Sequence, residues 1–143
     1  MSPAVADPAT IVRSYIGALN HGDPDAIASY VGDGFINEHT STLGETVRGR
    51  AAYRARLEGF LGTFRDLHYE IEQTIAEGAQ VAVAYRMSAR YQDPGSGAAV
   101  DCPIQIRGMF RFRVEHGQIV HRVDYWDGVE FQRQLQAAAR LKA

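Results

Sequence analysis

The fold is decided by the stretch FRDLHYEIEQTIAEGAQVAVAYRM, residues Phe64–Met87, because the spacing of apolar residues changes there. Before it, apolar residues recur every three or four positions, as in amphipathic helices. Within it they alternate with polar residues on both sides of a turn at Glu77-Gly78, which is typical of two paired strands. The residues expected to share one face are Leu67, Tyr69, Ile71 and Gln73, then Val81, Val83, Tyr85 and Met87. Helices are therefore predicted first, and a sheet after them.

Three helices are expected before this stretch, and two of them begin with the same pair of residues. Asp7-Pro8 and Asp23-Pro24 each place a capping carboxylate before a proline, whose missing N–H costs nothing at a helix start. The predicted helices cover about residues 8–21, 24–31 and 50–61. Between the last two we expect a short extended segment at 35–39 and a polar loop at 40–45.

The strand pattern continues beyond Met87. A turn is expected at Asp93–Gly97, then a long strand, a tight turn at His116-Gly117, a strand over Ile119–Trp126 and a closing helix. The inward face of the long strand is predicted to be Ile104, Ile106, Gly108, Phe110, Phe112 and Val114, and the outward face Gln105, Arg107, Met109, Arg111 and Arg113. Helices followed by hairpins predict an α+β domain with the helices on one face of an antiparallel sheet.

Length and charge limit the function classes. The 143 residues are predicted to form one domain over residues 1–143, large enough for an internal cavity. Fifteen basic against 17 acidic side chains argue against a nucleic-acid or membrane-surface partner. The single cysteine, Cys102, indicates a reducing compartment. No apolar run approaches a membrane span and residues 1–10 do not read as a signal peptide, so a cytoplasmic location is expected.

Cofactor and metal motifs are missing from the sequence. It contains no glycine-rich phosphate loop, no dinucleotide fingerprint and no G-x-S-x-G nucleophile elbow. The five histidines do not show metal-ligand spacing, and Cys102 beside Pro103 is interpreted as a small buried side chain. We therefore expect neither a cofactor nor a metal.

Three segments resemble the SnoaL-like polyketide cyclases of the nuclear-transport-factor-2-like superfamily. They are IVRSYIGALNHGD (Ile11–Asp23), the hairpin Phe64–Met87, and FRVEHGQIVHRVDYWDGVEFQRQL (Phe112–Leu135). The resemblance covers about residues 8–136. It implies a cone-shaped fold in which three N-terminal helices pack on the concave face of a curved antiparallel sheet and a C-terminal helix closes it. It also implies a pocket on the concave face and a homodimer through the outer face.

Asp124 is the first candidate for chemistry. Arg122, Asp124 and Trp126 share one side of the last predicted strand. A carboxylate in an apolar cavity has a raised pKa, which suits proton transfer. By resemblance, Asp124 stands at the acid/base aspartate of SnoaL-like cyclases and at an aspartate of limonene epoxide hydrolases. The alternatives are an ion pair with Arg122 or a cap on the last helix, although Asp127 is the expected cap.

The extended segment Phe35–His39 supplies further candidates. Asn37 matches an asparagine of epoxide hydrolases of this fold, whereas Phe35 replaces their tyrosine. Glu38 stands at the general base of ketosteroid isomerases, and cyclases often carry a histidine at or beside it, here His39. Either could accept a proton, or Glu38 could be a solvated strand end.

Neither of the two related catalytic sets is complete. Tyr15 matches the oxyanion tyrosine of ketosteroid isomerases, or is plain core, and the second donor of that site falls at Gly108. The arginine and second aspartate of the epoxide hydrolases fall at Tyr85 and Met87. Both activities therefore rank below a cyclase.

The leading hypothesis is a cofactor-free enzyme that cyclises, by intramolecular aldol chemistry, or isomerises a hydrophobic oxygenated molecule such as a polyketide. Its expected catalytic residues are Asp124, Glu38, His39, Asn37 and Tyr15. Its expected substrate-binding residues are Phe35, Tyr85, Met87, Ile106, Gly108, Phe110, Arg122, Trp126 and Phe131. The first alternative is a non-catalytic ligand-binding domain. The second alternative is an accessory dimerisation domain whose outer arginines, Arg111 and Arg113, contact a partner.

Overall fold

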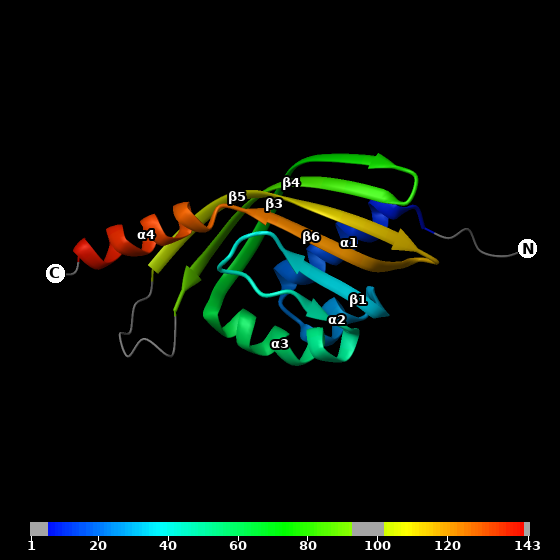
Figure 1. The fold of residues 1–143 in the computed structure, drawn as a ribbon, viewed down its shortest axis with the longest axis horizontal. Helices are drawn as coiled ribbons and strands as arrows, with labels where there is room; N and C mark the ends of the chain where they lie inside the picture. Colours follow the sequence, from blue (N-terminus) through cyan, green and yellow to red (C-terminus); the bar gives the residue numbers. More distant parts are fainter. Residues whose placement is uncertain (1–5, 93–101, 142–143) are drawn as a thin grey trace, which may run out of the picture.

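The computed structural model describes residues 6–92 and 102–141. In chain order the elements are α1 (Pro8–His21), α2 (Pro24–Ala28), β1 (Val31–His39), β2 (Val47–Arg48), α3 (Arg50–Thr63), β3 (Phe64–Glu77), β4 (Gln80–Tyr91), β5 (Cys102–Glu115), β6 (Gln118–Trp126) and α4 (Gly128–Leu141) (Figure 1). The expected turn at Asp93–Gly97 lies outside the described residues.

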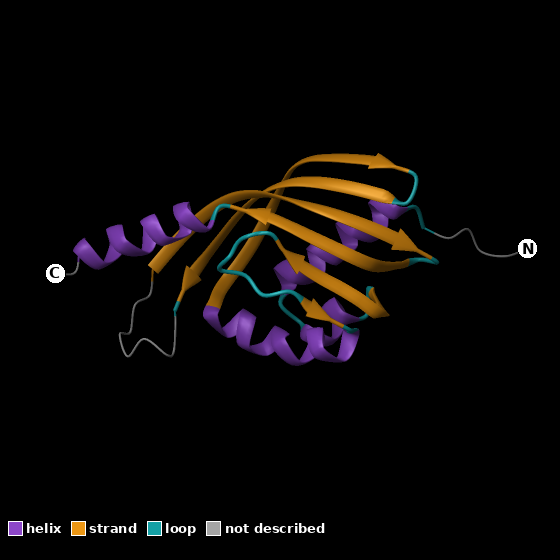
Figure 2. Cartoon of the chain, viewed as in Figure 1, coloured by secondary structure: helices purple, strands orange, loops and turns teal. Residues whose placement is uncertain are grey.

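The strands form one curved sheet in the order β2-β1-β6-β5-β4-β3 (Figure 2). Helices α1, α2 and α3 lie along the concave side of the sheet, and α4 packs against β5 at one end. This confirms the expected α+β fold. The sheet is antiparallel except between β1 and β6, which run parallel. The long connection through α3 and β3–β5 leaves the relative direction of β1 and β6 unconstrained by any tight turn.

The predicted helix starts are confirmed. The Asp7 carboxylate accepts from Thr10 N at 2.8 Å, and α1 ends at Gly22, whose φ of 81° is the left-handed conformation that glycine adopts without strain. Asp23 caps α2 in the same way. The second helix is shorter than expected, however, because Val31 belongs to β1, where it pairs with Ile119.

The alternation predicted for the long strand is also confirmed. Phe110 and Phe112 are fully buried toward the helices, whereas Arg107 and Arg111 are exposed on the outer face. In β3 the expected pattern fails after Ile71. A β-bulge there shifts the register, so that Gln73 no longer shares the face of Ile71.

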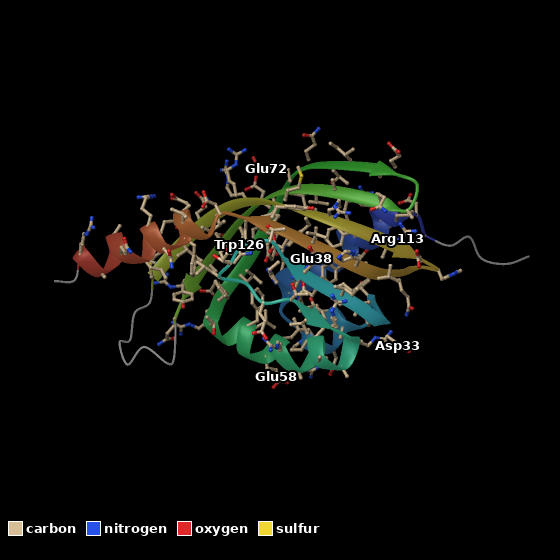
Figure 3. The ribbon with its side chains drawn as sticks, in the orientation of Figure 1. Asp33, Glu38, Glu58, Glu72, Arg113 and Trp126 are labelled. Carbon is tan, nitrogen blue, oxygen red and sulfur yellow. The ribbon has the colours of Figure 1, made fainter. Side chains whose placement is uncertain are left out.

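Acidic neighbours pair with arginines of the outer face. Arg107 makes a bidentate pair with Glu72 at 3.0 and 2.9 Å, and Arg113 contacts Glu115 at 2.7 Å. Figure 3 shows Glu72 on this outer side, whereas Glu58 of α3 lies on the opposite side of the sheet. Of the three arginines expected on the outward face, Arg107 and Arg113 are therefore paired with acids, whereas Arg111 donates to the Tyr125 hydroxyl at 3.3 Å.

Two polar contacts fix the helices to the sheet. Asn20 of α1 bonds reciprocally to the backbone of Tyr69, donating to its carbonyl at 3.0 Å and accepting from its N–H at 2.7 Å. Arg50, at the start of α3, donates through Nε and Nη2 to the carbonyl oxygen of Val31 at 2.9 and 2.6 Å. The core lies between the helices and the concave face that these contacts hold together.

Candidate active site

A cavity of about 620 Å³ lies between α3 and the concave face of the sheet. Most of its wall is apolar or aromatic. The aromatic lining comes from α3, from strands β3, β4 and β6 and from α4, and includes Tyr53, Phe60, Tyr69, Tyr85, Trp126 and Phe131. Such a cavity has the size and character of a small-molecule site.

Asp124 is the buried acid of this cavity. Only 6% of the residue is exposed, and its Oδ1 accepts a hydrogen bond of 2.6 Å from the hydroxyl of Tyr85. Its Oδ2 lies 3.7 Å from Nδ1 of His39. Burial raises the pKa of Asp124 to about 6, although the nearby Arg122 cation and the Tyr85 hydrogen bond both oppose the rise.

Neither alternative reading of Asp124 is realised among the described residues. No ion pair joins it to Arg122 within 4.0 Å, because the guanidinium is turned toward other partners. The cap of α4 is Asp127, which accepts from the backbone N–H groups of Val129 and Glu130 at 3.0 and 3.1 Å. The expected cap is thus confirmed at Asp127.

Gly108 gives the Tyr85 hydroxyl its place beside Asp124. Gly108 is the direct partner of Tyr85 in the β4–β5 pairing. A Cβ at this position would collide with the hydroxyl of Tyr85 and with the carbonyl oxygen of Tyr125. Gly108 was expected to be a substrate-binding residue, but the side chain of Tyr85 occupies the space beside it.

Arg122 forms a second buried polar group beside the acid. The residue is 6% exposed, its Nε donates to Asn37 Oδ1 at 2.9 Å, and its Nη1 donates to the Tyr15 hydroxyl at 2.9 Å. Its guanidinium lies 4.9 Å from the ring centroid of Phe110. The parallel pairing of β1 with β6 sets Asn37 beside Arg122 and His39 beside Asp124, on the same face.

His39 is a neutral neighbour of the acid. Its Nδ1 accepts a hydrogen bond of 3.2 Å from the indole N–H of Trp126, so the neutral ring carries its proton on Nε2. Burial, together with the Arg122 cation, lowers the pKa of His39 to about 4. The ring is therefore uncharged at neutral pH.

Thirteen of the fourteen expected site residues line the cavity or lie directly behind its lining. Nine line the cavity: Asn37, His39, Tyr85, Met87, Ile106, Arg122, Asp124, Trp126 and Phe131. Tyr15, Phe35 and Phe110 are fully buried behind that lining, and Gly108 lies beneath Tyr85.

Glu38 lies on the opposite face of β1. Its side chain is 44% exposed, and its carboxylate contacts Nε2 of His121 at 3.0 Å (Figure 3 labels Glu38). Of the two candidate proton acceptors on this strand, only His39 therefore reaches the cavity.

Two further tyrosines line the cavity that were not among the expected site residues. Tyr53 of α3 lines the cavity and its hydroxyl is hydrogen-bonded to that of Tyr15. Tyr69 of β3 also lines it and stacks edge-on against Tyr85. In the sequence, both tyrosines lie on the apolar faces of their elements. That position was the one feature that could have predicted them as cavity residues.

The described residues contain no group of three or more metal-ligating side chains that could hold an ion. Within the same residues, no helix has the length and apolar character needed to cross a bilayer.

The order of the elements and the curved sheet are those of the nuclear-transport-factor-2-like fold. The SnoaL-like domain family matches residues 12–122, so the chain belongs to that family. No curated protein matches the chain.

Solved structures share the fold at low sequence identity. A proposed polyketide cyclase from Xanthomonas campestris pv. campestris is 24% identical over 90% of this chain and 96% of its own, with a TM-score of 0.80. A proposed SnoaL-like polyketide cyclase from Shewanella denitrificans is 19% identical over 91% of this chain and 97% of its own, with a TM-score of 0.81. TerC, co-crystallised with polyporic acid, is 14% identical over 90% and 98%, with a TM-score of 0.75.

Proposed function

We propose that this protein is a cofactor-free enzyme that uses Asp124 as acid and base on a hydrophobic, oxygenated small molecule. The observation that carries the proposal is a buried carboxyl with a pKa of about 6 in the wall of a largely apolar cavity. Near neutral pH such a group exists in both protonation states, as a catalyst that accepts and returns a proton must. The relatives assigned as polyketide cyclases support a polyketide-like substrate.

The reaction needs one proton shuttle and good positioning. The Asp124 carboxylate removes a proton from a carbon next to a carbonyl, and the C–H electron pair delocalises onto the carbonyl oxygen. In a cyclisation, the enolate carbon then bonds to a second carbonyl carbon of the same molecule, and Asp124 returns its proton to the alkoxide formed. In an isomerisation, Asp124 returns the proton to another carbon. Each outcome balances without an oxidant or reductant.

Two neighbours support the role of Asp124. Burial and the adjacent Asp124 charge raise the pKa of Tyr85, so its hydroxyl remains a donor to Oδ1 across the working pH range. The other oxygen, Oδ2, accepts no hydrogen bond from the described residues, which makes it the oxygen that exchanges the proton. Asn37 and His39 line the cavity on the adjacent strand, where they can orient the substrate.

The test uses proton exchange, which does not require the natural substrate. In D2O, the protein should accelerate exchange of the acidic C–H protons of 2-tetralone, a bicyclic ketone, as followed by NMR. Asp124→Asn should reduce that acceleration by roughly 10²-fold or more. Glu38→Gln, on the opposite face of β1, is the matched control and should retain it. Equal rates for wild type and Asp124→Asn would contradict the proposal.

A non-catalytic binding domain is the second candidate. The observation in its favour is the predominantly apolar lining, together with the absence of an acidic donor at Gly108. In that case, 2-tetralone would bind with no accelerated exchange in the wild-type protein.

We further propose a homodimer through the outer face of the sheet, in a reducing cytoplasmic compartment. Met109 and Tyr125 are 40% and 42% exposed there, among paired charges. Light scattering of wild type and of Met109→Glu would test the dimer, which the substitution should weaken.

A further inference from the structure

Arg122 is a buried cation whose hydrogen-bond partners are neutral. Among the described residues no carboxylate lies within 4.0 Å of its guanidinium, and its acceptors are the amide oxygen of Asn37 and the hydroxyl of Tyr15. Buried charges in proteins are normally paired, because an unpaired one is costly to keep out of water. A cation held in this way, in the wall of a cavity, favours a ligand with a negative charge.

Apart from the ionised form of Asp124, the other charges around the cavity do not compensate that of Arg122. Glu45 and Arg56, at the mouth, form a bidentate pair with each other at 2.9 Å. His39 is neutral. Asp124 lies two residues along β6 on the same face, and its negative charge disappears whenever it holds a proton.

Asn37 adds a donor directed at the same place. Its Oδ1 accepts from Arg122, and its Nδ2 makes no hydrogen bond with the described residues although the side chain is only 6% exposed and lines the cavity. An amide nitrogen donates and cannot accept, so an oxygen atom is the natural partner for it.

We propose that Arg122 and Asn37 form an oxyanion subsite, and that the substrate is an enolisable carbonyl compound whose ionised oxygen is held there. This inference rests on the proposed function and extends it to the substrate class. The developing enolate oxygen is stabilised by the fixed Arg122 charge and by the Asn37 N–H, which are in place before the reaction starts.

With this subsite, proton transfer from the substrate to Asp124 leaves the net charge inside the cavity unchanged. Before the transfer, Asp124 carries one negative charge beside the cation. Afterwards the proton is on Asp124 and the same charge is on the substrate oxygen next to Arg122. The total charge in the cavity is unchanged, so no additional buried charge has to be accommodated.

Binding of a stable anion tests the subsite without catalysis. The probes are 2-hydroxy-1,4-naphthoquinone, which is ionised at neutral pH, and its neutral analogue 2-methoxy-1,4-naphthoquinone, both measured by titration calorimetry. Asn37→Asp gives Arg122 an isosteric carboxylate partner. The substitution should weaken binding of the ionised probe by about tenfold or more and change the affinity for the neutral probe by less than about threefold. Asp124→Asn removes a negative charge that repels the ionised probe, and should therefore make that probe bind more tightly.

Arg122→Met should give the same selective loss as Asn37→Asp. Thermal unfolding confirms that each variant is folded, and because Arg122→Met removes a buried hydrogen-bonding group, Asn37→Asp carries the test if the former does not fold. Arg56→Met, which deletes a positive charge at the cavity mouth, is the control. It should change the affinity for the ionised probe by less than about threefold.

Equal losses for both probes in Asn37→Asp, or an Arg56→Met loss as large as that of Asn37→Asp, would overturn the subsite. The result is separable from that for Asp124. Selective loss in Asn37→Asp with normal 2-tetralone exchange in Asp124→Asn would keep the subsite and reject the acid/base role. The reverse pattern would reject the subsite alone.

Discussion

Tyr85 of β4 donates a hydrogen bond of 2.6 Å to Asp124 of β6, although β5 lies between the two strands. The contact is possible because the β5 partner of Tyr85 is Gly108, which has no side chain to block the tyrosine hydroxyl on its way to Asp124. One glycine therefore determines the environment of the buried acid.

Tyr85→Phe should raise the pKa of Asp124 above its value of about 6. The hydroxyl bonds to the carboxylate and so favours its ionised form, and its loss favours the protonated form. NMR titration of the Asp124 carboxyl carbon measures the shift. Tyr69→Phe removes a hydroxyl from a neighbouring ring that does not bond to Asp124, and should leave the pKa nearly unchanged. A larger shift in Tyr69→Phe than in Tyr85→Phe would contradict the assignment.

Gly108→Ala should destabilise the fold by about 1–3 kcal/mol, because its Cβ would overlap both the Tyr85 hydroxyl and the backbone oxygen of Tyr125. It should also displace Tyr85 from Asp124 and change the pKa as Tyr85→Phe does. Gly17→Ala, in α1 with open space around it, is the control and should stabilise by roughly 0.5–1 kcal/mol. Denaturant unfolding measures the free energy of unfolding of both variants. An unchanged value for Gly108→Ala would show that the strands move apart to accommodate the Cβ.

Asp124→Asn should become more stable than wild type as pH rises. The folded pKa of about 6 exceeds the ordinary value of 3.8, so the folded state holds its proton more tightly, and wild-type stability falls as pH rises from about 4 through 6. The variant lacks this loss. The unfolding free energy of the variant relative to wild type should therefore increase by on the order of 3 kcal/mol between pH 4 and pH 8, as measured by urea unfolding at each pH. A constant difference would mean that Asp124 titrates normally.

His39→Gln should show the opposite pH dependence. The folded pKa of about 4 lies below the ordinary 6.5, so wild-type stability is lost as pH falls through this window. The variant avoids that loss, and its stability relative to wild type should rise by about 3 kcal/mol from pH 7 to pH 4. His68→Gln, on an exposed position of β3, serves as the control. In wild type the contributions of His39 and Asp124 oppose each other between pH 4 and 6.

Asn20→Ala should cost about 1–3 kcal/mol of unfolding free energy, because it removes both hydrogen bonds that join α1 to the backbone of Tyr69 in the edge strand β3. Ser14→Ala, exposed on the same helix, should be close to neutral. Similar values for the two variants would show that the contact contributes little.

Much of the fold followed from local patterns. The Asp-Pro pairs and Gly22 marked the ends of α1 and the start of α2, and alternation in β5 separated Phe110 and Phe112 from the exposed arginines. The errors lie where neighbours override such patterns. Val31 joined a strand because Ile119 pairs with it, and the bulge after Ile71 reversed the faces of β3.

The candidate site was only partly predictable. Strand alternation correctly grouped Arg122, Asp124 and Trp126 as cavity residues. The choice between Glu38 and His39 depended on how β1 lies beside β6, a pairing between segments more than 80 residues apart.

The sequence by itself determined most of the elements and the family, because capping, period and turn chemistry act between residues that are close along the chain. It also determined that Asp124 would share a face with Arg122. Only the tertiary structure decided what surrounds that acid. Tyr85 reaches it over Gly108, and Arg122 turns to Asn37 and away from Asp124, since these contacts depend on packing across several strands, where burial changes the electrostatics of every group.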